Sequence, residues 1–324
     1  MNKRSKLGTV LILIGIVGLT YVIATGGKSP LEGMTSFFTT EVNERQTVDA
    51  AAITNLSVKS DSIDVHIVRV NGGTEASATL EGSATKALLK HLKLTAEPKG
   101  DTLEVALEGK RGFGVGFGWS RIKLTIELPD KTYNRIEVNV DSGDITAEGL
   151  TFNEAAWHAD SGDIAASGLT SLSSLKATAN SGDLHFEQVE AKTVELGADS
   201  GDITVKDYKA EGINFEASSG DVALFDGLSQ LKGSVRSGDI HLQADNLKHD
   251  TELKTTSGDV IVELVETPSS LAVHFDAGSG EGVIQKDGFV YTGGEANTDN
   301  FTGTFGAGEI KLKVSVGSGD FVLK

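Results

Sequence analysis

The tripeptide Ser-Gly-Asp recurs at a nearly fixed spacing from residue 142 onward, and it restricts the possible folds more than any other feature. Successive copies are separated by 19, 20, 19, 19, 18 and 20 residues. A fixed period of this length is typical of a solenoid, in which each repeat buries its apolar face only by stacking on its neighbours. The regularly spaced copies begin at Ser142, Ser161, Ser181, Ser200, Ser219, Ser237 and Ser257. Degenerate copies follow around Ser279 and Gly308, and the chain ends in GSGDFVLK with Ser318.

Each repeat also shows the alternation of apolar and polar residues that indicates a β-strand. An apolar residue follows each Asp, as Ile203 does, and in the better copies a second stands two positions later, as Val205 does. Another short apolar stretch precedes each motif. Two strands and two turns use up about 20 residues, which leaves no room for a crossover helix. The fold class we predict is all-β, a parallel β-helix (β-solenoid), and the handedness of parallel crossovers favours a right-handed one.

The motif itself is typical of a corner of the chain. Glycine reaches positive φ without a Cβ penalty. Asp and Ser side chains bind nearby main-chain groups and hold a bend. We therefore interpret the Ser-Gly-Asp copies as turns stacked along one edge of the solenoid.

A second interpretation is a row of cation ligands. Aspartates of successive coils would lie about 4.8 Å apart, where like charges repel by about 1 kcal/mol in water, so Ca²⁺ between coils is physically reasonable. Calcium-binding repeats, however, place several ligands in every nine residues or so. We expect no dedicated metal site and no cofactor, with weak Ca²⁺ binding left open at Asp144, Asp163, Asp183, Asp202, Asp221, Asp239 and Asp259.

The regularity of this row argues against catalysis. Carboxyl groups on adjacent coils could approach the roughly 5 Å separation of a retaining glycosidase. An acid and a base need unlike environments, however, and the repeated aspartates occupy equivalent ones. His185 and His241 share an offset after the motif but lie three coils apart, too far to bind one metal ion. We predict that the protein is not an enzyme and has no catalytic residues.

A predicted membrane-targeting segment precedes the repeats. Leu7–Ala24 carries no charge and follows Lys3, Arg4 and Lys6. This length spans a bilayer core of about 30 Å, and the positive flank stays cytoplasmic. We predict a basic cytoplasmic flank (1–6), a single-pass transmembrane signal anchor (7–25) and a linker (26–46), with the following domain extracellular. A signal peptide cleaved after small residues such as Ala24 is the alternative.

Two further regions follow the linker. Residues 47–140 show strand alternation and one stretch of helical spacing, 85–94, and predict a β-rich N-terminal cap region. Residues 141–324 form the predicted solenoid with its C-terminal cap, in which 290–324 would close the far end. The net charge of −17 excludes nucleic acid as a natural partner, because phosphate neutralisation needs a basic surface.

A glycine-aromatic stretch, RGFGVGFGWSR at 111–121, is the best candidate for a local interaction site. Its aromatic residues alternate with glycine, so they share one face of a strand. Such a face ordinarily packs into a core, but flanking cations also suit a membrane interface or a partner. The predicted interaction patch consists of Phe113, Phe117, Trp119, Arg111 and Arg121.

The stretch IELPDKTYNRIEVNVDSGDITAEGL (126–150) and the repeats after it resemble the LiaG-like family of β-strand-repeat proteins, which are proposed adhesins. The resemblance covers about 47–324. It implies a membrane-anchored extracytoplasmic protein of the Gram-positive cell envelope, linked to envelope stress systems, with no catalytic residues to carry over. We expect a non-enzymatic adhesin or interaction scaffold that contacts a cell-envelope protein or polymer. A surface polysaccharide-binding or polysaccharide-processing β-helix is the alternative.

Overall fold

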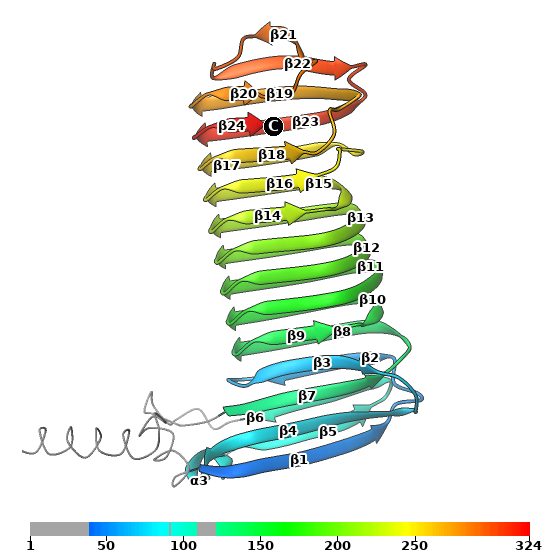
Figure 1. Ribbon diagram of the computed structural model, residues 1–324. Helices are drawn as coiled ribbons and strands as arrows, with labels where there is room; N and C mark the ends of the chain where they lie inside the picture. The colour runs from blue at the N-terminus through cyan, green and yellow to red at the C-terminus, as the bar shows by residue number, and fades with distance from the viewer. Residues whose placement is uncertain (1–38, 91, 109–120) are drawn as a thin grey trace, which may run out of the picture.

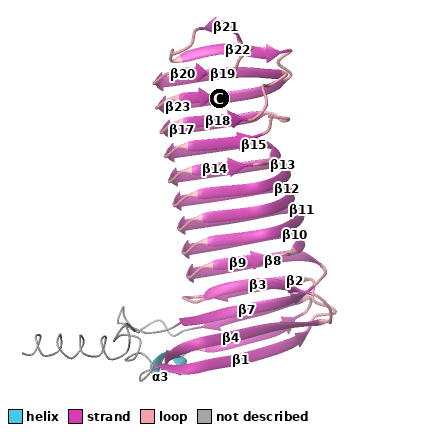
Figure 2. Ribbon diagram, in the orientation of Figure 1, coloured by secondary structure: helices cyan, strands magenta, loops and turns pink. Residues whose placement is uncertain are grey.

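Parallel β-strands stacked coil upon coil form most of the molecule (Figure 1). The computed structural model describes residues 39–90, 92–108 and 121–324. Strands dominate these residues, and their one helix is the single turn α3 (Lys86–Leu89), capped by the Thr85 hydroxyl (Figure 2). The helical spacing predicted over 85–94 ends early because strand β5 (Lys93–Lys99) pairs with β6 (Thr102–Glu108). The all-β solenoid prediction is confirmed.

Three consecutive coils show the repeat most clearly. They are β11 (Ile164–Ser181), β12 (Leu184–Ser200) and β13 (Ile203–Ser219), each joined to the next by a Ser-Gly-Asp corner. In β12 the buried positions are 184 and 186, then 189 and 191, then 194, 196 and 198. The alternation slips by one residue at each break, and at the first break Gln188 adopts φ 56°. Each of these coils therefore has three straight runs rather than the two predicted. The first bend falls on a glycine in β11, Gly168, but on Gln188 in β12 and Asp207 in β13, so no repeated glycine marks it in the sequence.

Two columns of parallel strands continue this stack. Each strand that precedes a Ser-Gly-Asp corner pairs with the equivalent strand of the next coil, so that Ser142, Ser161 and Ser181 are in register. The first column adds β2 (Asn55–Ser60), β8 (Thr132–Ser142), β10 (Thr151–Ser161), β15 (Leu228–Ser237) and β17 (Thr251–Ser257). The second adds β3 (Asp64–Val70), β9 (Ile145–Glu148), β14 (Val222–Phe225), β16 (Ile240–Ala244) and β18 (Val260–Leu264). The predicted right-handedness stays a prediction.

The stack begins before the first Ser-Gly-Asp. Strand β2 lies between β6 and β8, and β3 lies between β7 (Arg121–Pro129) and β9, all parallel. Residues 55–70 are thus already a coil, and the predicted boundary at residue 140 does not mark where stacking starts. Antiparallel strands β1 (Thr39–Asp49) and β4 (Glu75–Thr85) complete this end.

At the other end, spatial order departs from chain order. Strands β23 (Ile310–Ser318) and β24 (Phe321–Leu323) lie between β17/β18 and β19 (Ser270–Ser279)/β20 (Gly282–Ile284) (Figure 1). Only β21 (Val290–Gly294) and β22 (Asn300–Gly306) cover the end. The prediction that all of 290–324 closes the solenoid is therefore wrong for 310–324, which we call the inserted coil.

The core is one continuous column of side chains inside the coils. Trp157 is buried and stacks on Phe186 with ring centroids 6.2 Å apart, while Phe152 meets it edge-on. A second aromatic cluster fills the C-terminal end, where Phe275 lies 5.3 Å from the rings of both Phe301 and Phe321. The large buried rings of these two clusters stabilise the stacking of neighbouring coils through apolar burial.

Candidate functional site

The Ser-Gly-Asp aspartates form a continuous hydrogen-bonded column along one edge of the solenoid. Oδ1 of Asp183 accepts a hydrogen bond from the main-chain N–H of Asp202 at 2.8 Å, and Oδ1 of Asp202 accepts one from Asp221 at 2.7 Å. Each carboxylate therefore binds the next coil rather than its own turn. The Asp column runs, in spatial order, through Asp64, Asp144, Asp163, Asp183, Asp202, Asp221, Asp239, Asp259, Asp320 and Glu281.

The glycine of the motif is required by contact between coils as well as by backbone angle. Gly201 has φ 146°, a region that L side chains rarely adopt. A Cβ on Gly201 would lie 2.1 Å from the carbonyl oxygen of Gly182 in the preceding coil. The same clash recurs at every interior corner from 162 to 258. Glycine thus lets successive corners approach to stacking distance.

The serines complete the corner through their main chain. The carbonyl of Ser219 accepts a hydrogen bond from the Gly201 N–H at 3.0 Å, and the interior corners repeat this contact. The hydroxyls face outward, and Ser279 donates to Ser318 at 3.1 Å. Every residue type of the motif therefore has a role in joining coils.

This arrangement gives the Asp column a structural use. Within residues 39–90, 92–108 and 121–324, no group of three or more Asp, Glu or His residues is arranged to hold a metal ion. One oxygen of each carboxylate is already engaged by a neighbouring N–H. Weak Ca²⁺ binding along the column stays a prediction.

The two histidines lie where their offset places them. His185 and His241 occupy equivalent outward positions on β12 and β16, with two coils between them. Nε2 of His241 lies 3.2 Å from Oε1 of Glu263, and its ring meets Phe225 edge-on. The structure does not bring the histidines together.

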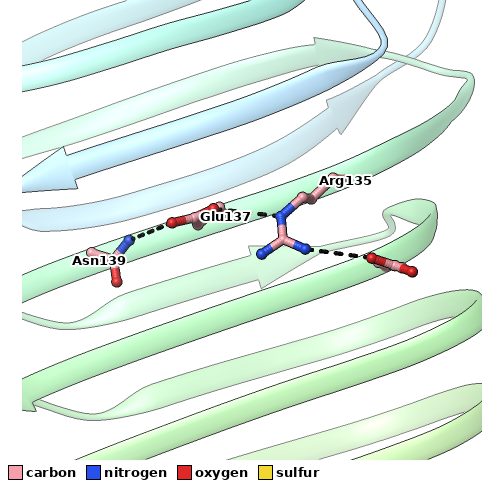
Figure 3. A network of polar contacts seen from close by, with 4 residues as sticks. Arg135, Glu137 and Asn139 are labelled. Atoms are coloured by element: carbon pink, nitrogen blue, oxygen red, sulfur yellow. Dashed lines mark hydrogen bonds and ion pairs between the residues drawn. The ribbon is translucent and has the colours of Figure 1, made fainter.

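Polar networks cross the outer face from coil to coil. Arg135 on β8 contacts Glu137 on its own strand and Glu154 on β10, each at 3.4 Å, and Asn139 donates to Glu137 at 3.3 Å (Figure 3). These side chains are largely exposed, and such pairs contribute about 0–1 kcal/mol each. Lys176–Glu195 and Lys209–Glu190 repeat the pattern between later coils.

A shallow depression lies on the outer face of β17, β23 and β19. Its lining includes the charged residues Glu252, Lys254, Lys313 and Asp276, together with Gly317. Lys313 donates to Glu252 at 3.1 Å and, by this hydrogen bond and its charge, lowers the pKa of that carboxyl. A carboxyl held ionised in this way is unsuited to donate a proton as a general acid.

Several predicted features fall outside the described residues. Arg111, Phe113, Phe117 and Trp119 belong to this group, and of the patch only Arg121 is placed, at the start of β7. The predicted anchor over 7–25 also lies outside. In the part of the chain that the structure describes, no helix is both long and apolar enough to cross a membrane.

Sequence reasoning missed members at both ends of the Asp column. Asp64 follows Ser-Asp-Ser-Ile instead of Ser-Gly, and Glu281 replaces Asp in a degenerate copy. Asp320 stands in a full Ser-Gly-Asp, but 61 residues separate it from its partner Asp259. The alternation around 55–70 was the available signal for an additional coil.

The fold and its corner column define an all-β solenoid repeat protein. Residues 53–324 match the Toastrack DUF4097 family, and the chain belongs to this family. The narrower LiaG-like assignment stays a prediction. No curated protein matches the chain.

Solved structures give more distant likenesses. The chain is similar to a proposed adhesin from Bacteroides fragilis, with 12% identity over 88% of this chain and 98% of that chain and a TM-score of 0.44. A proposed adhesin from Parabacteroides distasonis shows 14% identity over 86% and 97%, with a TM-score of 0.43. A proposed lipid-binding protein from the same organism shows 15% identity over 87% and 96%, with a TM-score of 0.38. At these values the likeness carries no functional argument.

Proposed function

We propose that this protein is a non-enzymatic adhesin or interaction scaffold of the cell envelope. The observation that carries the proposal is the Asp column. Aspartate is the residue type that recurs often enough to form repeated active sites. Its carboxylates instead join neighbouring coils, by hydrogen bonds of 2.7 to 3.0 Å. A solenoid joined in this way is a stiff body with long outer faces, which suits binding of extended partners.

The outer faces support this use. They carry exposed charges of both signs, with an excess of acid over the whole chain. Mixed charges keep such a surface soluble and favour partners with complementary charge. Alternative use as a polysaccharide-processing β-helix would need two carboxyl groups in unlike environments. The pKa of Glu252 in the depression is shifted downward, the direction opposite to that of a general acid.

Membrane anchoring is part of the same proposal. Residues 7–25 form an uncharged apolar stretch long enough to span a bilayer, with basic residues before it. The described fold starts at Thr39 on β1, at the end of the stack that also holds β7. The glycine-aromatic stretch precedes β7 in the chain, so the proposal puts it near the membrane, where Trp and Phe suit the interface. A role in the envelope stress response follows from the LiaG-like resemblance alone.

Crosslinking in cells tests the proposal. The full chain, with a photoactivatable residue at position 117, is expected to capture an envelope protein or polymer. With the photoactivatable residue moved from 117 to a second position, the paired substitution F117S/W119S should abolish capture of the partner without changing the midpoint of unfolding. Leu172→Ser is the matched control, because Leu172 is 56% exposed on a mid-solenoid coil and should be dispensable.

Two results would contradict the proposal. Equal loss of capture in the Leu172→Ser chain would show that the aromatic stretch has no specific role. Release of sugar fragments from purified envelope polysaccharide by the wild-type chain would show that the protein is an enzyme.

A further inference from the structure

The inserted coil fills a slot between two coils that precede it in the chain. Strands β17 and β18 form one wall, and β19 and β20 form the other. Parallel neighbours lie about 4.8 Å apart, so without 310–324 the two walls would stand about two spacings apart with unpaired inner edges. A slot of this kind is a template for one added coil.

Main-chain hydrogen bonds fill the slot from both sides. On one wall Val260 N–H donates to the Asp320 carbonyl at 2.9 Å, and on the other Phe321 N–H donates to the Glu281 carbonyl at 3.0 Å. The Asp column passes through the slot as well, from Asp259 to Asp320 to Glu281. The buried side chains of the inserted coil are Leu312, Val314, Val316, Phe321 and Leu323.

Charge selects the occupant. Lys313 donates to Glu252 at 3.1 Å, and Lys324 lies 2.6 Å from Glu263, so two of the three lysines of the inserted coil meet acids of the β17/β18 wall. In an acidic chain, a basic strand with this alternation is distinctive. The sequence IKLKVSVGSGDFVLK thus fits the slot by hydrogen bonding, by apolar pattern and by charge.

The connection into the inserted coil is short and exposed. Gly306 and Gly308 adopt φ values of 54° and 68°, and Ala307 and Glu309 are exposed. Glycine can change between such bends and an extended path at little steric cost. This hinge can therefore direct 310–324 either into its own slot or away from it.

We propose that two copies of this chain pair by exchanging residues 310–324, each copy filling the slot of the other. The exchanged dimer keeps every contact of the slot, which makes exchange a low-cost route to pairing. The slot lies near the end of the stack opposite β1, with β19/β20, β22 and β21 beyond it (Figure 1), so the paired chains meet near these ends with their N-terminal ends apart. The exchange depends only on how the coils stack, so its test is independent of the proposed adhesion.

Cysteine pairs test the exchange in the full chain, which has no cysteine of its own. Glu252 and Lys313 are register partners, and a strand spacing of about 4.8 Å suits a disulfide. Chains carrying E252C and chains carrying K313C are unfolded together in detergent, refolded at high concentration and oxidised. We expect a disulfide between unlike chains, and the E252C/K313C double variant should close within one chain when refolded dilute.

The matched control is the pair K176C and E195C, which occupies the same outer face on interior coils that precede the hinge. Co-refolded K176C and E195C chains should give at most one tenth of the mixed-disulfide yield that E252C and K313C chains give. Absence of the mixed disulfide between E252C and K313C, when the double variant does oxidise, would overturn the proposal. Equal yields from the two pairs would overturn it too, because they would show unspecific contact.

Discussion

Replacing one aspartate in the middle of the column separates a structural carboxylate from a cation ligand. Asp202 accepts the Asp221 N–H at 2.7 Å and donates its own N–H to Asp183 at 2.8 Å. Asparagine keeps an oxygen at the acceptor position but removes the charge. Alanine removes both. The two variants, Asp202→Asn and Asp202→Ala, therefore differ in one hydrogen bond.

The expected magnitudes follow from the geometry. A net hydrogen bond of this kind is worth about 1 kcal/mol at an exposed site. Each neighbouring carboxylate, about 4.8 Å away, repels Asp202 by about 1 kcal/mol in water at low salt, and both variants relieve this repulsion. We expect Asp202→Asn to be at least as stable as the wild type in low salt, and Asp202→Ala to be about 1 kcal/mol less stable than Asp202→Asn.

Urea unfolding of the full chain in low and high salt measures these differences. High salt screens the repulsion, since the Debye length falls to about 3 Å at 1 M, so the advantage of Asn over the wild type should vanish while the Asn–Ala difference remains. Equal destabilisation by Asn and Ala would refute the reasoning. That result, together with a wild-type midpoint raised by Ca²⁺ and lowered by a chelator, would show that the charge itself is needed to bind cations.

Three further predictions concern the same coils and the N-terminal end. Gly201→Ala should lower the free energy of unfolding by at least about 3 kcal/mol, because the new side chain strains the backbone and clashes with the preceding coil. Gly212→Ala should raise the free energy of unfolding by about 0.5 kcal/mol, because nothing lies within 4 Å of the Cβ that the substitution adds. Thermal melts compare them, and equal effects would contradict the corner argument. Gln188→Gly should raise the free energy of unfolding by about 0.5 to 1 kcal/mol, since it relieves φ 56°; a lower midpoint in urea would count against this. The Ser77 hydroxyl and then Arg45 lower the pKa of Glu127, so this carboxylate stabilises the fold above its unfolded pKa near 4.5, and the contribution is lost as pH falls through the lower folded value. Melting midpoints between pH 6 and 3 should fall less steeply in Ser77→Ala than in wild type, and an unchanged slope would disprove the link.

The period of the motif predicts the stack, because a solenoid repeats the same environment in every coil. The roles of Gly201 and Asp202 in contacts between coils were only partly predictable, since the sequence shows the turn but not which neighbour each group meets. The bend at Gln188 was hidden because a non-glycine residue occupies a positive φ.

Features at the two ends depart from the period for physical reasons. At the first corner Ser60 is buried, and its hydroxyl bonds both the N–H and the carbonyl of Ile63, so the coil needs no Ser-Gly-Asp there. The inserted coil pairs Ser257 with Ser318 across 61 residues, a contact that no local pattern encodes. Sequence-based reasoning therefore found the interior of the solenoid and missed how its ends are closed.

The most direct test of the central claim replaces the seven regularly spaced Ser-Gly-Asp aspartates by asparagine in one chain. The positions are Asp144, Asp163, Asp183, Asp202, Asp221, Asp239 and Asp259. Circular dichroism during thermal unfolding is the measurement. Because asparagine keeps the acceptor oxygen in every coil, we predict a strand spectrum and a midpoint at least as high as that of the wild type in low salt. An unfolded chain, or a midpoint that drops to the value of the chelator-treated wild type, would contradict the structural role of the column.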